Sequence, residues 1–166
     1  MWEDDTMWKY RDLSMLVTRE YFLSFVKKYE INYFIVNNNI VFAIDKYIFR
    51  IYGYTIENCL YMDVFDFENK KIESFSTLRA ILFNQDFIID FYKKEVKLFN
   101  ETNFDAKIER DFFYSKICFL NNFYDCFFKN RIDIFFDRAA NELQCAEYEK
   151  LVKEYYPDLY DKYRKK

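Results

Sequence analysis

Three carboxylates stand close together in this sequence, and carboxylates are the side chains that it offers for chemistry. Asp63, Asp66 and Glu68 fall near the end of a predicted strand. Paired carboxylates can act as acid and base in a glycosidase, or they can hold Mg²⁺ for phosphoryl transfer. The same group follows Tyr61, and tyrosine beside acidic residues suits contact with a basic protein. We take Tyr61, Asp63, Asp66 and Glu68 as candidate partner-binding residues, with carboxylate catalysis as the alternative.

A second pair of carboxylates, Asp133 and Asp137, has the spacing of one helical turn. Arg131 and Arg138 flank this pair along the chain. Surface ion pairs between these four residues explain the pattern more simply than a catalytic site does. Such pairs stabilise a helix by only a few tenths of a kcal/mol. A catalytic role is therefore the less favoured prediction for either acidic group.

The residue types that the sequence lacks exclude several classes of active site. The chain has no histidine and a single glycine. Without histidine there is no Ser-His-Asp or Cys-His catalytic group and no imidazole metal ligand. With one glycine, neither a GxGxxG phosphate-binding loop nor a GxSxG nucleophile turn can be built. We predict a protein that is not an enzyme, with no catalytic residue, no cofactor and no bound metal.

The four cysteines show no metal-binding or disulfide pattern. Cys59, Cys118, Cys126 and Cys145 form no CxxC pair. Cys118 and Cys126 lie two turns apart on one predicted helix, which is too far for a disulfide between them. We expect all four to be reduced thiols that fill space in the core.

Charge and hydropathy narrow the kinds of partner. The net charge of -3 and the pI near 5.2 argue against direct binding to nucleic acid. The uncharged stretch Asn32–Ile44 is too short to cross a membrane. The first ten residues are acidic and lack the apolar core of a secretory signal. We expect a cytoplasmic protein with no membrane partner.

The first half of the chain predicts a helix followed by a sheet. Residues 1–17 are expected to be loosely ordered apart from a helical turn near 12–17, and a helix over 18–30 is expected to begin with Thr18 as its cap. Alternating aromatic and β-branched residues over 33–75 predict four or five antiparallel strands in a meander, with Asn37–Asn39 as a hairpin loop. In the strand 47–52, the phase that contains Arg50 is predicted to be partly wet. Gly53 is expected to take a positive φ in the turn that follows.

The second half of the chain, residues 76–163, predicts only helices. A short helix starts at Ser76, another runs over 84–99, and an amphipathic helix extends from Ile132 through Leu143 toward Tyr155. The longest helix, over 103–130, has two apolar rows. We expect it to be central, with one row against the sheet and the other against the C-terminal helices. Strands followed by helices indicate an α+β fold, with residues 1–166 as a single domain.

The aromatic composition favours a protein that works by contact with another protein. Sixteen tyrosines cannot all be fully buried, since each hydroxyl needs a hydrogen-bond partner, so many rings should be half exposed. In size, acidity and lack of catalytic motifs, the chain resembles bacterial immunity proteins that neutralise a cognate toxin; the resemblance covers composition and not individual residues. It implies a non-catalytic antitoxin. We expect a monomer or small homo-oligomer. A phage-encoded inhibitor of host defence, of the anti-CRISPR kind, is the first alternative. A carboxylate-only metal enzyme or a structural oligomer subunit is the second.

Overall fold

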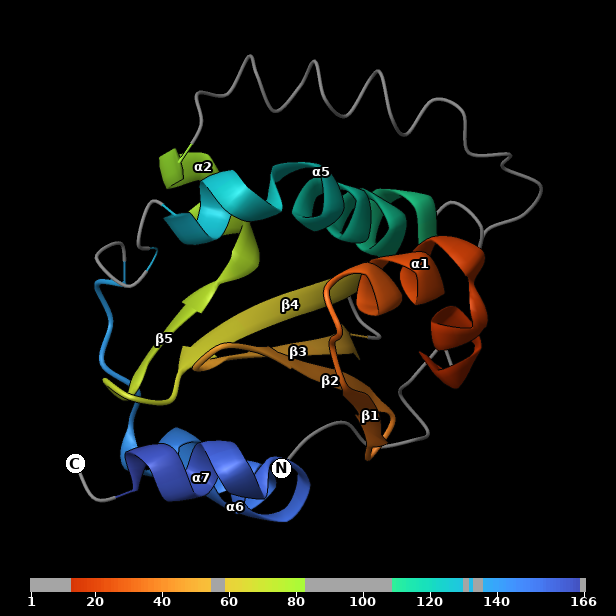
Figure 1. Cartoon of the computed structure of the whole chain (residues 1–166). Coiled ribbons are helices and arrows are strands. Elements are labelled where there is room, and N and C mark those ends of the chain that lie inside the picture. The colour runs from red at the N-terminus through yellow and green to blue at the C-terminus, as the bar shows by residue number, and fades with distance from the viewer. Residues whose placement is uncertain (1–12, 55–58, 83–108, 130–131, 133–135, 165–166) are drawn as a thin grey trace.

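A five-stranded antiparallel sheet forms the middle layer of the protein, with helices on both of its faces (Figure 1). This arrangement comes from a computed structural model, which describes residues 13–54, 59–82, 109–129, 132 and 136–164. The strands follow one another in sequence order across the sheet, so the predicted α+β fold with a meander sheet is confirmed. They are β1 (Tyr33–Val36), β2 (Asn39–Ile44), β3 (Tyr47–Tyr54), β4 (Cys59–Asp66) and β5 (Lys71–Ser74).

Tight turns fix the register of the strands. Asn37 and Asn38 have φ of 50° and 59° and form the predicted turn between β1 and β2, because asparagine tolerates the left-handed conformation of a two-residue hairpin. Asp45 and Lys70, with φ of 54° and 56°, serve the same purpose after β2 and β4. The turn predicted at Gly53 is wrong. This residue lies inside β3, which continues to Tyr54, and no glycine in the described ranges has a positive φ.

One face of the sheet is covered by α1 and α5, with shorter helices beside them. Figure 1 shows these elements above the sheet. Their apolar residues form one cluster with the strand residues that point toward them, including the fully buried Phe42 and Phe49. The turn predicted near residues 12–17 is present as η2. The elements are η2 (Leu13–Thr18), α1 (Glu20–Lys28), α2 (Phe75–Leu82), the π-helix η3 (Glu109–Tyr114) and α5 (Ser115–Lys129).

The start of α1 differs from the prediction. Its N-cap is Arg19, and the hydroxyl of Thr18 instead donates to the carbonyl of Met15 at 2.6 Å. The guanidinium of Arg19 binds both carboxylate oxygens of Glu109, at 2.9 and 3.0 Å, and the Tyr21 hydroxyl donates to the same carboxylate. Glu109 is only 3% exposed. The first turn of α1 is therefore anchored by a tertiary ion pair to η3 and not by a local cap.

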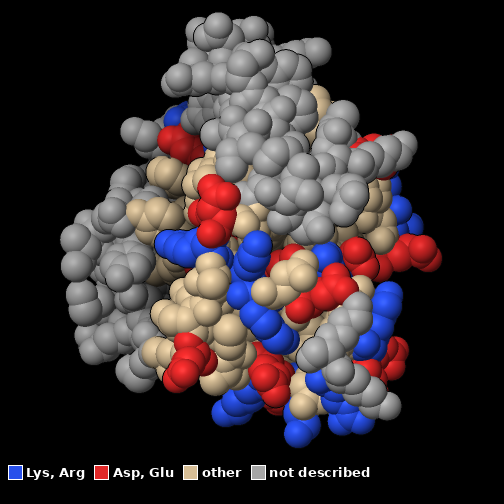
Figure 2. Space-filling view, turned by 90° about the vertical axis from the view of Figure 1, so that its left-hand side faces the viewer, with Lys and Arg blue, Asp and Glu red and all other residues tan. Residues whose placement is uncertain are grey.

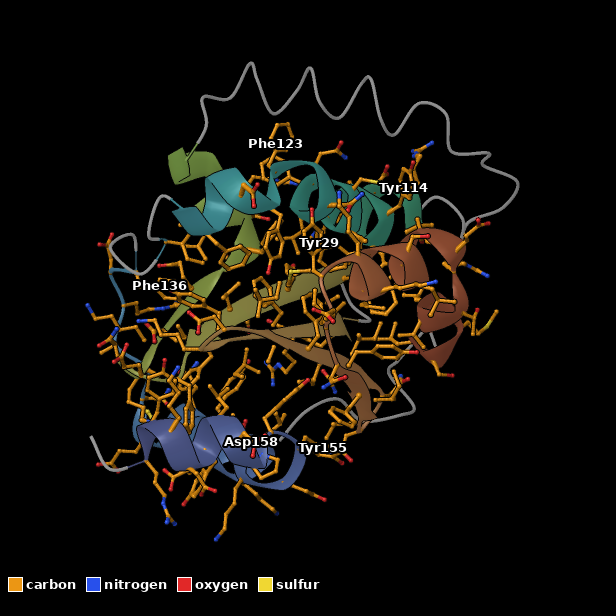
Figure 3. The ribbon with its side chains drawn as sticks, in the orientation of Figure 1. Tyr29, Tyr114, Phe123, Phe136, Tyr155 and Asp158 are labelled. Atoms are coloured by element: carbon orange, nitrogen blue, oxygen red, sulfur yellow. The ribbon has the colours of Figure 1, made fainter. Side chains whose placement is uncertain are left out.

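The long predicted helix is present over Glu109–Lys129 as η3 followed by α5, and residues 103–108 lie outside the described part. The helix is interrupted at Phe123, whose φ of -120° and ψ of 23° are not helical. Near this point the Tyr29 hydroxyl donates to the carbonyl of Asn121 at 3.0 Å, and the Tyr29 and Tyr124 rings stack at 3.8 Å. Figure 3 shows Tyr29 between α1 and α5. The end of α1 thus binds the helix backbone where α5 bends.

The described residues of both apolar rows pack into the same cluster. Ile117 and Leu120 are buried in it, and Phe119 contacts the Phe75 ring of α2 at 6.1 Å. The expectation that one row meets the C-terminal helices is wrong, because the sheet separates α5 from them. The row that contains Phe119 has α2 as its neighbour. The predicted helix over 84–99 lies outside the described residues.

The other face of the sheet is covered by α6 (Glu142–Tyr155) and α7 (Pro157–Tyr163), drawn in blue in Figure 1. Asn141 caps α6, since its side chain accepts from the Gln144 N–H at 2.8 Å and the Gln144 side chain accepts from the Asn141 N–H at 3.0 Å. Pro157 is the first residue of α7 and separates the two helices. Within the described ranges, no helix has the length and apolar character needed to cross a membrane. Apolar residues of the sheet and α6 form a second hydrophobic cluster on this face, which contains Val41, Ile48, Phe65, Phe67, Ile72, Tyr148, Leu151 and Val152.

The chain before α6 runs along the edge of β5. Ala139 pairs with Lys71, the Ile72 N–H donates to the Arg138 carbonyl at 3.0 Å, and the Ala140 N–H donates to the Lys70 carbonyl at 3.0 Å. The helix predicted from Ile132 into Leu143 is therefore wrong over residues 136–141, because their backbone is needed to close the sheet edge. Figure 2 shows basic and acidic side chains interspersed on this side of the molecule.

Candidate functional site

Polar side chains gather on the α6 face of the sheet, beyond the apolar cluster. Arg50 and Tyr52 of β3 stand opposite Asp63 and Tyr61 of β4 in the strand register. Side chains at opposed positions leave the same face of a sheet. Tyr148 of α6 lies over them, with its ring centroid 5.7 Å from Arg50 Cζ. We call these five residues the Arg50 cluster.

An ion pair and two aromatic rings surround the guanidinium of Arg50. Arg50 Nη2 donates to Asp63 Oδ2 at 3.3 Å, and their side chains are 10% and 18% exposed. Arg50 Cζ lies 4.5 Å from the Tyr52 ring, within the range of a cation–π contact. The Tyr52 and Tyr61 ring centroids are 5.8 Å apart, and both side chains are half buried. The cluster therefore presents two neighbouring tyrosine rings beside a charged pair.

Burial is the main cause of the raised pKa values in the cluster. It raises the pKa of Asp63 more than the neighbouring Arg50 lowers it. Burial, together with the negative charge of Asp63, raises the pKa of Tyr52 to about 12. Complete burial also raises the pKa of Tyr148. Both phenols therefore stay protonated to a higher pH than an exposed tyrosine does.

The hydroxyl of Tyr148 is buried and has no hydrogen-bond partner among the residues that the structure describes. Its ring stacks on Phe65 at 4.4 Å with an interplanar angle of 1°, which fixes the position of the phenol. An unsatisfied buried hydroxyl costs about 1–3 kcal/mol. The α6 face therefore holds a polar group whose burial opposes folding, and the packing of its ring holds it in place.

The structure brings together only two of the four predicted partner-binding residues. Tyr61 and Asp63 belong to the Arg50 cluster, whereas Asp66 is the last residue of β4 and Glu68 lies in the turn that follows. Asp66 is 0% exposed, and its Oδ1 accepts two backbone N–H groups of that turn at 3.0 and 3.1 Å. Glu68 Oε1 accepts from Lys46 Nζ at 2.7 Å. Asp66 thus stabilises the turn and offers no surface to a partner.

The second predicted carboxylate pair does not share a helix turn. Asp137 is exposed and lies in the non-helical segment beside β5, and Asp133 is outside the described residues. No three histidine, cysteine, aspartate or glutamate side chains are placed to hold a metal ion in the ranges that the structure describes. Cys118 and Cys145 are free thiols.

Sequence reasoning missed Arg50, Tyr52 and Tyr148 as members of the site. A signal for the first two was present, because Arg50 and Tyr52 lie in the strand phase predicted to be partly wet. Their juxtaposition with Tyr61 and Asp63 depends on the register of β3 against β4. Tyr148 gave no such signal, since its contact with the sheet depends on which face α6 covers.

Comparisons of the chain with protein-family models, curated proteins and solved structures found no match. The Arg50 cluster is consequently the main observation from which a function can be inferred.

Proposed function

We propose that this protein neutralises a partner protein by binding it, with Tyr52 and Tyr61 of the Arg50 cluster at the centre of the contact. One observation carries the proposal: the two half-buried rings are held 5.8 Å apart beside a largely buried Arg–Asp pair. Tyrosine and arginine are enriched among the residues that supply most of the binding energy at interfaces. Because Tyr52 and Tyr61 stand on paired strands, their side chains lose little conformational freedom when a partner binds.

The charge of the chain favours a basic partner. The net charge is -3, and a complementary partner is steered toward an acidic protein during diffusion. A toxin that acts on nucleic acid is basic for the reason that it must bind phosphate. We therefore propose an immunity protein or antitoxin in the cytoplasm, which binds one toxin molecule and blocks its activity without chemistry of its own. An effector of host defence is the other partner of this kind.

Capture from the native host, followed by reconstitution, tests the proposal. A tagged chain should retain one protein at one-to-one stoichiometry, and the purified partner should lose its activity when the chain is added. Tyr61→Ala should weaken the complex by about tenfold to a hundredfold, the effect of removing an aromatic anchor.

Tyr163→Ala is the matched control. Tyr163 is also a half-buried tyrosine, but it is the last residue of α7 and packs against the apolar cluster on that face. The Tyr163→Ala variant should therefore bind the partner with unchanged affinity. Equal affinities for the Tyr61 and Tyr163 variants would exclude the Arg50 cluster as the contact, and a complex that leaves the partner fully active would exclude the inhibitory role.

A further inference from the structure

The side of the molecule that carries β1 exposes apolar side chains. Met15 of η2, Leu23 of α1 and Ile35 of β1 are 53%, 41% and 37% exposed. Figure 1 shows these three elements together at the right-hand end of the molecule. Leu143 on α6 is the one other large hydrophobic residue exposed to this degree in the described ranges. We call the surface of Met15, Leu23 and Ile35 the β1 side. Exposed apolar residues that gather on one side indicate a contact surface.

Leu23 leaves α1 on the flank that faces away from α5. Tyr21 marks the opposite flank, because its ring lies 4.8 Å from that of Tyr114 and 5.9 Å from that of Phe113, both in η3. Two residues along a helix correspond to a rotation of about 200°. Leu23 therefore projects beyond the sheet on the side of β1.

Among the described residues, no strand other than β2 pairs with β1, so its outer edge presents backbone groups that can pair with another strand. The two-residue turn after Val36 makes alternate residues of β1 bond to β2, so the N–H and C=O of Ile35 point outward. Charged residues and proline, which protect sheet edges from pairing, are absent from Tyr33–Val36. The β5 edge, by contrast, is closed by the backbone of Arg138 and Ala140.

The outer stripe of α1 is complementary to itself. Glu20, Leu23, Ser24 and Lys27 are all exposed and have the i, i+3, i+4, i+7 spacing of one helix face. Two such helices, antiparallel about a two-fold axis that passes between Leu23 and Ser24, place Glu20 opposite Lys27 of the second copy, and this contact occurs twice. A two-fold contact requires a patch that is its own complement.

We propose that two copies of this chain associate through the β1 side about such an axis. The two-fold that makes the α1 stripes antiparallel also makes the two β1 strands antiparallel, so both elements can meet a copy of themselves. The contact covers the exposed Leu23 and Ile35 and supplies a pairing strand for the backbone of Ile35. The Arg50 cluster lies on the opposite face of the sheet, so this inference does not rest on the proposed function.

Charge reversal and its rescue test the dimer. Size-exclusion chromatography with light scattering should show the full-length chain as a dimer at micromolar concentration. Glu20→Lys and Lys27→Glu should each raise the dimer dissociation constant by about tenfold or more, because each replaces two attractive contacts by repulsive ones. The double variant, Glu20→Lys with Lys27→Glu, restores opposite charges and should return the constant to within about threefold of the starting value.

Controls separate this contact from general effects of charge. Glu20 and Lys27 are exposed, so circular dichroism should show every variant folded. Leu23→Lys should dissociate the dimer, whereas Leu143→Lys, at a residue with 64% exposure on α6, should not. A chain that is monomeric at all concentrations overturns the proposal. A double variant that stays monomeric, or equal effects of the Leu23 and Leu143 changes, also overturns it.

Discussion

The two faces of the sheet are covered in different ways, and β3 shows the difference along its length. Toward α1 and α5 it contributes Tyr47, Phe49 and Ile51, which all belong to the main hydrophobic cluster. Toward α6 it contributes Ile48 to the second cluster, and then Arg50, which pairs with a carboxylate. The first face is apolar along the whole strand. The second face changes from apolar to polar halfway.

The two faces contribute differently to the stability of the fold. The first face gains free energy from burial of rings such as Phe42 and Phe49, which stack at 4.9 Å. On the second face, burial of the Arg50–Asp63 pair gains little net free energy, because desolvation offsets the attraction between the charges. A group whose burial does not favour folding must be explained by positioning or by binding. The contact that we propose for Tyr52 and Tyr61 lies on this second face.

The largest effect is expected from Phe119→Ala on the first face. Phe119 is 0% exposed, and removal of its ring should lower the free energy of unfolding by about 3–5 kcal/mol. Urea denaturation measures the loss. Phe123→Ala is the comparison on the same helix, since its side chain is half buried at the non-helical position and should cost less than about 2 kcal/mol. Equal losses in the two variants would mean that the first face is not the rigid core described above.

A smaller loss is expected from Asp63→Leu on the second face. This change leaves the guanidinium of Arg50 largely buried without its carboxylate, and it should lower the free energy of unfolding by about 3 kcal/mol. Adding Arg50→Met should recover most of the loss, because both charges are then gone. If the double variant is less stable than Asp63→Leu alone, Arg50 stabilises the fold through contacts other than Asp63, such as the Tyr52 ring, and the contrast between the faces is wrong.

The attachment of α6 to the second face should be sensitive to its cap. Asn141→Ala removes the acceptor of the Gln144 N–H bond and should cost about 1 kcal/mol in thermal or chemical denaturation. Asn141→Asp keeps an acceptor at the same place and should retain most of the stability. Similar losses for alanine and aspartate at this position would show that the cap is not the source of the effect.

The smallest effect is expected at alkaline pH. Tyrosine is charged when deprotonated, and burial raises the pKa of Tyr52 to about 12 from an ordinary value of 10.0. The folded state therefore keeps a proton that the unfolded chain releases, so stability falls as the pH rises from 10 toward 12. Tyr52→Phe should remove this part of the fall when denaturation is followed at several pH values. Identical pH dependence in the two proteins would place Tyr52 in a wetter environment than the structure does.

The sheet could be predicted from the sequence because its signals are local. Alternation along the strands and the turn at Asn37 and Asn38 specify the meander without reference to distant residues. The segment 136–141 could not be predicted in this way. Its apolar residues Ala139 and Ala140 have helical spacing with Leu143, but their backbone pairs with the edge of β5.

The candidate site was predictable only in part for the same reason. Tyr61 and Asp63 were predicted as site residues because they are close in the sequence, and Asp66 was included for the same reason. Opposite strand phases separate Asp63 from Asp66, and burial then excludes the latter. The start of α1 shows a similar limit, since Arg19 is fixed by Glu109, 90 residues later, and not by a neighbouring hydroxyl.

The backbone bond between Lys70 and Ala140 has a consequence for the rate of folding. The two residues are 70 positions apart (140 minus 70), whereas neighbouring strands of the meander are joined by short turns. Contacts across short loops form early, and closure of a long loop is slower because more chain must be ordered. We therefore expect the β5 edge to stay open for an interval after the strands have paired. During that interval a second unfolded chain can add to it, so the slow step of folding is also the step that protects the sheet from aggregation.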